Sequence, residues 1–254
     1  MMRILHTTLP AVLAGITIFG AAQAATSAPA AKPAAVRQKL NPPPPVELRY
    51  AIKAKQKGLS LEGEAVTKWT ASAGSFSTTN QVRAALLGKI LDTRSEGTID
   101  AYGLAPAAFQ EKRMRRDATT TTFDRAGKTI RFNESGETAP IRGGEQDRGS
   151  VLWQLISVAR AAPSKAKTGA QWTFDVAGRR DVDRWTFKAI GQEKISTGAG
   201  ELNTLHIVRT PPADSKEQQL DLWLAPSMEW YPVQLRYSED DGDYIEQTLQ
   251  QVKR

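Results

Sequence analysis

The sequence predicts a mainly β protein: a strongly curved antiparallel sheet or incomplete β-barrel of about ten strands, with one amphipathic helix packed on it. Two observations lead to this prediction. From Val46 onward, short runs of alternating apolar and polar residues are separated by turn-forming residues, which is typical of antiparallel strands. Residues 146–162 instead space their apolar side chains at helical intervals. One helix among many strands favours a bent sheet that holds the helix against its apolar side.

The first 45 residues precede this pattern and are expected to lie outside the β domain. Residues 1–24 combine a basic Arg3, a short apolar core and an Ala-Gln-Ala cleavage pattern, which indicates a cleavable signal peptide. An uncleaved anchor is the alternative, but the apolar core is short for a bilayer span. Residues 25–45 are rich in Ala and Pro, so they predict a disordered tether. Residues 46–254 then form a single β-rich domain.

Turn signals separate the expected strands. The signal is sharpest at Asp241-Gly242 and moderate at Glu96-Gly97, where two short strands are expected within residues 89–102. A turn at residues 124–127 is expected to join the arms of a hairpin within residues 108–133. The other expected strands are residues 46–54, 59–69, 75–82, 171–178, 184–191, 201–210, 219–226, 231–238 and 243–252.

The helix is expected to start near residue 150. Asp147 or Ser150 can cap its first turn, because a short side-chain oxygen can accept the unpaired backbone N–H groups there. Pro163 lies beyond its end. The apolar positions at helical spacing are Val151, Leu152, Leu155, Ile156 and Ala159.

Composition restricts both anchoring and partners. The chain has no cysteine, which excludes disulfides, thiol catalysis and a lipid-modified cysteine anchor. Its formal charge is +7, from 34 Lys and Arg against 27 Asp and Glu. This excess favours anionic neighbours such as lipid phosphates, acidic glycans or a membrane surface over nucleic acid, and the alternative is that it only aids solubility. With the signal peptide, it predicts a periplasmic or secreted protein with no transmembrane segment after cleavage.

Few catalytic groups are available. Of the two histidines, one lies in the predicted signal peptide, so only His206 remains, and no metal or other cofactor is expected. His206 faces away from Leu205 and Ile207 and is either an ordinary strand histidine or a base paired with an unidentified carboxylate. Acid pairs such as Glu62 and Glu64 leave a carboxylate-dependent hydrolase open, although exposed acids are common on strands.

Aromatic residues give the first candidate site. Trp185 and Phe187 oppose Val182 and Ile190, and Trp223 opposes neighbouring leucines, so two strands carry large apolar groups on both faces. A sheet that is apolar on both faces needs two covers. One cover is the helix, and the other is a ligand, the chain's own loops or a partner protein. Trp185, Phe187 and Trp223 are therefore candidate ligand-binding residues.

A run of basic residues gives the second candidate site. In residues 111–116, alternation places Arg113 and Arg115 on one face of a strand. Such a ribbon could contact phosphates, or it could protect a sheet edge from aggregation. Interleaved aromatic residues, which nucleic-acid binding would need for base stacking, do not occur between Phe109 and Phe123. Arg113 and Arg115 join the candidate ligand-binding residues.

Six phrases together resemble a known family. They are "VELRYAIKAKQKGLSLEGEA", "GLAPAAFQEKRMRR", "FDRAGKTIRF", "GGEQDRGSVLWQL", "AGELNTLHIVR" and "LDLWLAPSMEWYPVQLRY". The chain resembles the exported bacterial family called domain of unknown function 3108 over nearly all of residues 46–252. This resemblance implies no established activity and no catalytic residues. The strand pattern is also similar, in architecture only, to the half-barrels of periplasmic lipoprotein carriers, and fold alone does not assign function.

These observations lead to one main hypothesis and two alternatives. The main hypothesis is a soluble, non-enzymatic periplasmic protein that binds an amphipathic envelope molecule, a lipid or acylated glycan, in its curved sheet. The first alternative is an envelope protein-protein interaction module that uses an edge strand and the proline-rich tether. The second is the carboxylate-dependent hydrolase.

Overall fold

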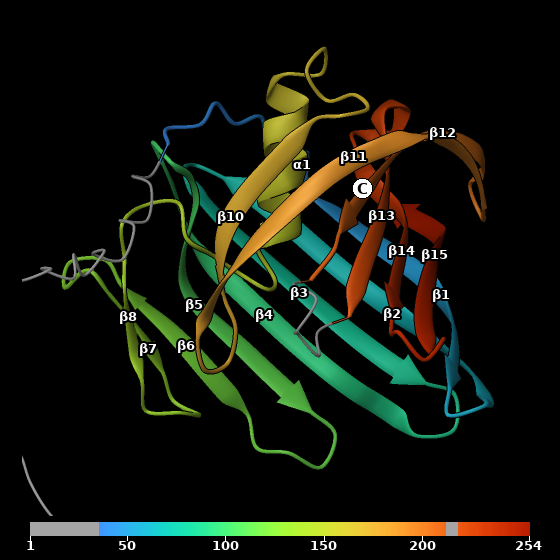
Figure 1. Ribbon diagram of the computed structural model, residues 1–254, viewed down its shortest axis with the longest axis horizontal. Coiled ribbons are helices and arrows are strands. Elements are labelled where there is room, and N and C mark those ends of the chain that lie inside the picture. The colour runs from blue at the N-terminus through green and yellow to red at the C-terminus, as the bar shows by residue number, and fades with distance from the viewer. Residues whose placement is uncertain (1–35, 212–217) are drawn as a thin grey trace, which may run out of the picture. The chain divides into compact units, whose positions relative to one another are not determined.

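The computed structural model describes residues 36–211 and 218–254, so the predicted signal peptide lies outside the described residues. These residues contain one α-helix and one sheet of fifteen strands, in the order β8-β7-β6-β5-β4-β3-β2-β1-β15-β14-β13-β12-β11-β10-β9. Neighbouring strands are antiparallel, except that β9 and β10 are parallel. Figure 1 shows the sheet curving around the helix α1.

The first eight strands are β1 (Val46–Gln56), β2 (Leu59–Ser72), β3 (Ser75–Ala84), β4 (Gly88–Asp100), β5 (Gly103–Arg113), β6 (Thr119–Asp124), β7 (Thr129–Phe132) and β8 (Thr138–Pro140). Then come β9 (Gln146–Asp147), α1 (Val151–Ala161), β10 (Gln171–Ala177), β11 (Val182–Thr197), β12 (Gly200–Arg209), β13 (Gln219–Ala225), a short 3-10 helix η1 (Pro226–Met228), β14 (Tyr231–Ser238) and β15 (Tyr244–Lys253).

The predicted mainly β class, the curved antiparallel sheet and the helix are confirmed, but the predicted count of about ten strands is wrong. Strands β8 and β9 are three and two residues long, which is too short for alternation to be visible in the sequence. Strand β5 begins with the run Gly103 to Ala107, which does not alternate and contains Pro106. Proline has no N–H for the ladder, so it argues against a strand there.

The predicted turn at Glu96-Gly97 is wrong, because both residues lie within β4. This strand runs unbroken through Glu96 and Gly97, where a hairpin turn was expected. The pairing with β5 shifts register between these two residues, and a Cβ built on Gly97 would lie 2.2 Å from the backbone oxygen of Ala105. This glycine permits a bulge and a close backbone approach rather than a turn. The predicted hairpin around residues 124–127 is present as β6 and β7, although residues 108–113 belong to β5.

The helix lies on the concave side and is buried by strands on opposite sides. Trp153 stacks on Trp69 of β2, with ring centroids 4.5 Å apart, and its indole N–H donates to Thr78 Oγ1 of β3 at 2.9 Å. Gln154 Oε1 accepts the backbone N–H of Leu104 at 2.8 Å, which ties the helix to β5. In Figure 1, β10 and β11 pass in front of α1 and β3 and β4 behind it. The predicted packing of one amphipathic helix on the sheet is therefore confirmed.

A buried carboxylate organises the start of the helix. Ser150 is the N-cap residue but makes no side-chain cap hydrogen bond. Asp147 Oδ1 accepts the backbone N–H groups of Gly149 and Ser150, and Oδ2 accepts the hydroxyl of Ser95 at 2.6 Å. Burial raises the pKa of Asp147 to about 6, against the opposing effect of these hydrogen bonds. Asp147 thus holds the turn before α1 in place.

The sheet curls until elements from its two ends meet. The turn between β10 and β11 contacts β6, where Thr121 Oγ1 donates to the carbonyl of Gly178 at 2.8 Å. In the same region Arg180 pairs with Glu134, which follows β7, at 2.8 Å. The sheet therefore encloses most of its apolar side, and a continuous core of buried side chains fills it.

Residues 41–45, here called the proline segment, are hydrogen-bonded to the β domain. Trp69 Nε1 donates to the carbonyl of Pro43, and the Tyr231 hydroxyl donates to that of Pro44, each at 3.0 Å. The backbone N–H of Asn41 donates to Ser157 in the second half of α1. The interpretation of residues 25–45 as a tether did not anticipate these contacts. Residues 25–35 lie outside the described residues, where the tether stays a prediction.

The first and last strands pair in the middle of the sheet. Strand β1 lies between β2 and β15, with Leu48 opposite Val252 and Ala54 opposite Ile245. The two halves of the chain are thus joined through strands almost 200 residues apart in sequence.

Candidate functional site

A cavity of about 600 Å³ lies on the concave side, next to the first turn of α1. The proline segment contacts the second half of the helix, so the cavity is at the other end of α1. The inner wall of the cavity is apolar and includes the buried Phe109, Val151 and Leu220. Together the apolar lining residues are Val82, Ile90, Leu91, Phe109, Val151, Leu152, Trp185, Leu220, Tyr237 and Ile245.

Four arginines and two glutamates add charge to this wall: Arg113, Arg148, Arg179, Arg209, Glu111 and Glu239. Glu111 is only 5% exposed, and its Oε1 accepts Arg113 Nε at 2.6 Å. Arg179 Nε lies 3.6 Å from the same oxygen. A carboxylate this buried needs such partners, because an isolated buried charge is costly. The cavity keeps an excess of positive charge.

Trp185 lies between cations in this wall. The guanidinium of the buried Arg209 lies 4.3 Å from the centroid of the Trp185 ring, and that of Arg148 lies 6.0 Å away. Arg209 also donates to the carbonyl of Gln218 at 3.2 Å. These distances are within the range of attractive cation–π contacts, which fix the ring and the guanidinium groups against each other.

The indole N–H of Trp185 is a buried donor. Among the residues that the structure describes, it has no hydrogen-bond acceptor. Such a donor costs free energy, and a buried tryptophan N–H usually finds an acceptor. Trp185 therefore brings an unused hydrogen-bond donor to the cavity wall.

The structure brings together two of the five predicted site residues. Trp185 and Arg113 line the cavity. Phe187 is fully buried in the core, with its ring centroid 6.2 Å from that of Trp185, and does not reach the cavity surface. Trp223 lies on the opposite face of β13 from Leu220, outside the cavity. The prediction that Arg113 and Arg115 share a strand face is wrong, because β5 ends at Arg113 and Arg115 lies in a turn with φ +58°.

Trp223 belongs instead to a polar cluster around His206. The two rings stack with centroids 4.3 Å apart. His206 Nδ1 lies 2.7 Å from Glu193 Oε1, and its Nε2 lies 2.8 Å from Asp221 Oδ1. The other Glu193 oxygen accepts the indole N–H of Trp223 at 2.8 Å. Asp221 and Trp223 thus make the second face of β13 a buried polar cluster rather than an open apolar groove.

The cluster favours the cationic form of His206. Burial lowers the pKa of His206, but its hydrogen bonds to Asp221 and Glu193 outweigh burial, and the pKa is raised. An imidazolium that donates from both nitrogens has no lone pair with which to accept a proton. The two carboxylate partners were not identifiable in the sequence. His206 does not line the cavity.

In residues 36–211 and 218–254, no group of three or more His, Asp or Glu side chains is arranged to hold a metal ion. Within the same described ranges, no helix has the length and apolar character needed to cross a membrane.

A comparison with known protein families identifies the family of this chain. The sequence pattern of the family described as "Protein of unknown function (DUF3108)" matches residues 49–250. The chain belongs to the DUF3108 family. The predicted resemblance is therefore confirmed over most of the chain. No curated protein matches it.

The fold of this DUF3108 protein is similar to that of a solved structure. It is the beta-barrel-like protein of domain of unknown function DUF1849 from Brucella abortus, with TM-score 0.55 and 13% identity, covering 86% of this chain and 99% of that one. A DUF1329 family protein from Desulfovibrio piger has TM-score 0.26 and 8% identity, covering 83% and 85%. The lipoprotein LppX of Mycobacterium tuberculosis has TM-score 0.23 and 11% identity, covering 80% and 84%. The last two scores are too low to support any argument.

Sequence reasoning missed most of the charged lining of the cavity in this DUF3108 protein. Arg209 had a usable signal, because it continues the buried row of Leu205 and Ile207 on β12. A charged residue at the end of an inward row marks a place where the core meets a polar site. Arg148 and Arg179 had no such signal, since they lie before the helix and in a turn.

Proposed function

We propose that this DUF3108 protein is an exported, non-enzymatic binding protein whose cavity holds an amphipathic anion of the cell envelope, such as a lipid or an acylated glycan. The observation that carries the proposal is the cavity of about 600 Å³, with an apolar wall and four arginines against two glutamates. Ligand sites typically measure roughly 300–1,000 Å³ and combine apolar walls with a few polar groups. Export rests on the predicted signal peptide in residues 1–24.

Each part of such a ligand has a counterpart in the cavity. An acyl chain can lie against Phe109, Val151 and Leu220, which are already buried and lose little side-chain entropy on binding. A carboxylate or phosphate can pair with the half-exposed guanidinium of Arg113. A ligand oxygen that reaches the edge of Trp185 can accept its indole N–H.

The surroundings of the acidic residues support a non-enzymatic role. Glu111, the buried acid of the cavity, is ion-paired with Arg113 and Arg179, so it is poorly placed to exchange protons with a substrate. Glu62 and Glu64, the pair considered from the sequence, are exposed on β2 and do not line the cavity.

The interaction-module alternative has less support. It relied on an edge strand and on a free proline-rich tether. The two edge strands of the sheet, β8 and β9, are three and two residues long and offer few backbone groups for strand addition. Pro43 and Pro44 already accept hydrogen bonds from the domain.

Ligand capture tests the proposal directly. Protein purified from the producing cells is analysed by native mass spectrometry and then stripped with organic solvent. The stripped protein is titrated with dansylaminoundecanoic acid, an anionic fluorescent fatty acid, and with its neutral methyl ester. We expect the acid to bind more tightly than the ester, because Arg113 pairs with its carboxylate. Arg113→Ala should weaken binding of the acid roughly tenfold and leave the ester nearly unchanged.

A second variant tests the place of binding. Leu152 lines the cavity and is half-buried, so Leu152→Trp adds volume inside it. We expect this change to weaken binding of both probes at least tenfold. The matched control is Ile190→Trp, which adds the same ring on the exposed outside of β11. Binding of the probes to Leu152→Trp with wild-type affinity contradicts the proposal, as does a wild-type protein that binds neither probe.

A further inference from the structure

Exposed apolar side chains gather at one end of the domain. Of the seven large apolar residues exposed in the described part of the chain, five lie in three neighbouring turns and strand ends: Leu59, Leu61, Leu86, Leu87 and Met114. We call these five residues the apolar rim. Leu86 is 92% exposed, Leu87 56% and Leu59 66%. Single exposed apolar residues are ordinary, but a group of them marks an interaction site.

Backbone hydrogen bonds place these segments side by side. The N–H of Ala85, next to Leu86, donates to Glu62 in β2 at 2.9 Å. The N–H of Met114 donates to Ile90 in β4, also at 2.9 Å. Ile90 and Arg113 line the cavity, so the apolar rim borders the cavity mouth.

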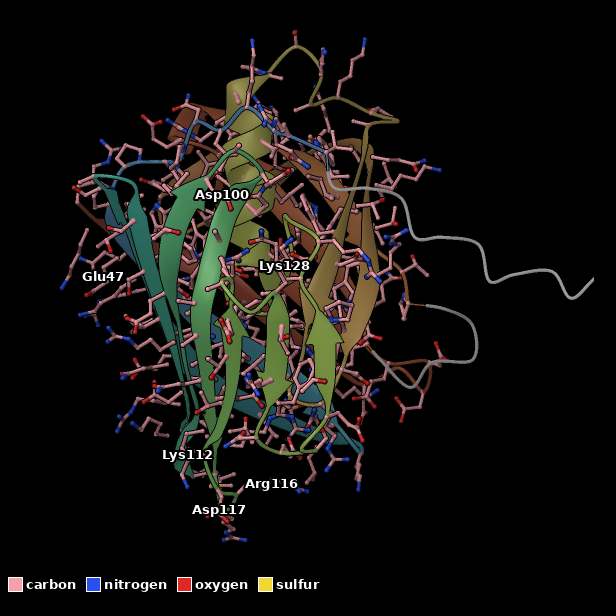
Figure 2. The ribbon with its side chains drawn as sticks, turned by 90° about the vertical axis from the view of Figure 1, so that its left-hand side faces the viewer. Glu47, Asp100, Lys112, Arg116, Asp117 and Lys128 are labelled. Carbon is pink, nitrogen blue, oxygen red and sulfur yellow. The ribbon has the colours of Figure 1, made fainter. Side chains whose placement is uncertain are left out.

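Basic residues flank the apolar rim. Five of the exposed cations lie in or beside the turns after β3 and β5, namely Arg83, Lys89, Lys112, Arg115 and Arg116, and in Figure 2 Lys112 and Arg116 lie at the protruding end of the turn after β5. Arg83 lies 3.8 Å from Glu64 and Lys89 lies 2.7 Å from Asp92, so these two are partly neutralised.

Acidic residues are also present at this end. Asp117 accompanies the basic turn in Figure 2. The turn between β14 and β15 carries Glu239, Asp240, Asp241 and Asp243, and Asp243 accepts the backbone N–H of Lys57. Exposed cations thus lie at the turns after β1, where Lys55 and Lys57 are exposed, after β3 and after β5, and the turn between β14 and β15 is acidic.

We propose that the apolar rim and its flanking cations form a docking surface for an anionic lipid membrane. Leucine side chains at a turn can enter the boundary between headgroups and acyl chains, while lysine and arginine pair with lipid phosphates. Charge complementarity favours an anionic membrane over an uncharged apolar protein surface as the partner, because only the membrane can form ion pairs with the five cations. Docking does not require a ligand in the cavity. If the proposed function holds, docking sets the cavity mouth against the lipid surface.

Vesicle co-sedimentation tests the docking surface. The processed chain, with its N-terminus determined by mass spectrometry, is mixed with vesicles of phosphatidylglycerol and phosphatidylethanolamine or of phosphatidylcholine alone. We expect at least tenfold tighter binding to the anionic vesicles, weakened by added salt. The double variant Leu86→Ser, Leu87→Ser should lose at least tenfold in affinity for the anionic vesicles. Arg115→Glu with Arg116→Glu should lose at least about 25-fold, because removing each positive charge costs roughly fivefold and the added negative charges weaken binding further.

Matched controls lie on the outside of β11, where Ile190 and Lys188 are exposed. Ile190→Ser and Lys188→Glu should bind vesicles like the wild type. The proposal fails if the wild type does not sediment with anionic vesicles, if it binds both vesicle types equally, or if a control variant loses as much affinity as a rim variant. Binding of dansylaminoundecanoic acid is measured on the same variants. Rim variants that keep probe binding but lose vesicle binding separate this inference from the proposed function.

Discussion

Replacing the buried carboxyl of Asp147 with the amide of asparagine should stabilise the protein at neutral pH. Asp147 is fully buried and accepts hydrogen bonds from two backbone N–H groups and from the hydroxyl of Ser95. In Asp147→Asn the amide oxygen can keep the two backbone bonds. The amide nitrogen can donate to the Ser95 hydroxyl oxygen, which accepts as well as donates. The substitution therefore removes the buried charge and reverses the direction of the hydrogen bond with Ser95.

The magnitude follows from the pKa. Burial raises the pKa of Asp147 from 3.8 to about 6. The protonated form is therefore favoured in the folded state, and the stability it contributes is present below pH 3.8 and is lost as the pH rises towards 6. At about 1.4 kcal/mol per unit of pKa, the loss is complete above pH 6 and amounts to about 3 kcal/mol. The Asn variant has no such dependence.

Urea unfolding followed by tryptophan fluorescence, at about pH 4 and about pH 7, measures the effect. The free energy of unfolding of Asp147→Asn, relative to that of the wild type, should rise by about 2–3 kcal/mol from the lower pH to the higher pH. Contributions from all other titratable groups cancel in this difference. Asp100→Asn is the control, because the Asp100 carboxylate is exposed and accepts the N–H of Tyr102 in a turn. If Asp147→Asn is less stable than the wild type at about pH 7, ionised Asp147 is required as a cap and the reasoning from burial is refuted.

Three further predictions concern other parts of the sheet. His206→Gln should cost about 1–2 kcal/mol at about pH 5.5 and less at about pH 9, because a raised pKa gives stability that is lost as pH rises through it; urea unfolding at both values checks this. Gly97→Ala should lower the midpoint of thermal unfolding by at least about 4 °C through its backbone clash, whereas Gly191→Ala, with open space around it, should change it little. Trp69→Phe should cost about 1–3 kcal/mol in urea unfolding, since it leaves the buried carbonyl of Pro43 without its donor.

Periodicity in the sequence predicted those strands and helices that have one face in the core and the other face outside it. Strand β12 illustrates this, because Leu205 and Ile207 point into the core while His206 points away. The helix was predicted for the same reason, with its apolar positions at helical spacing. Strand β5 was missed as a separate element because Leu104 and Ala105 are adjacent and both buried, so no alternation marks its start.

The candidate site was less predictable, because its residues are brought together only by tertiary structure. Trp185 was found through its own strand, but the cation over its ring, Arg209, comes from another strand and could not be assigned to it from the sequence. The partners of His206 were equally hidden. Glu193 is 13 residues away and Asp221 is 15, and strand pairing alone aligns them.

The central position of β1 beside β15 has a consequence for the order of folding. Strands β1 to β8 and β9 to β15 each pair mainly with their sequence neighbours, but the seam between the two groups closes only when β15 has been synthesised. Closing a loop of this length is slow, and until then both half-sheets keep a long unpaired edge. In a chain that lacks its last ten residues, the two half-sheets cannot pair through β1 and β15. Their unpaired edges are then expected to promote aggregation. Strand β15 is thus needed before the native strand order can form.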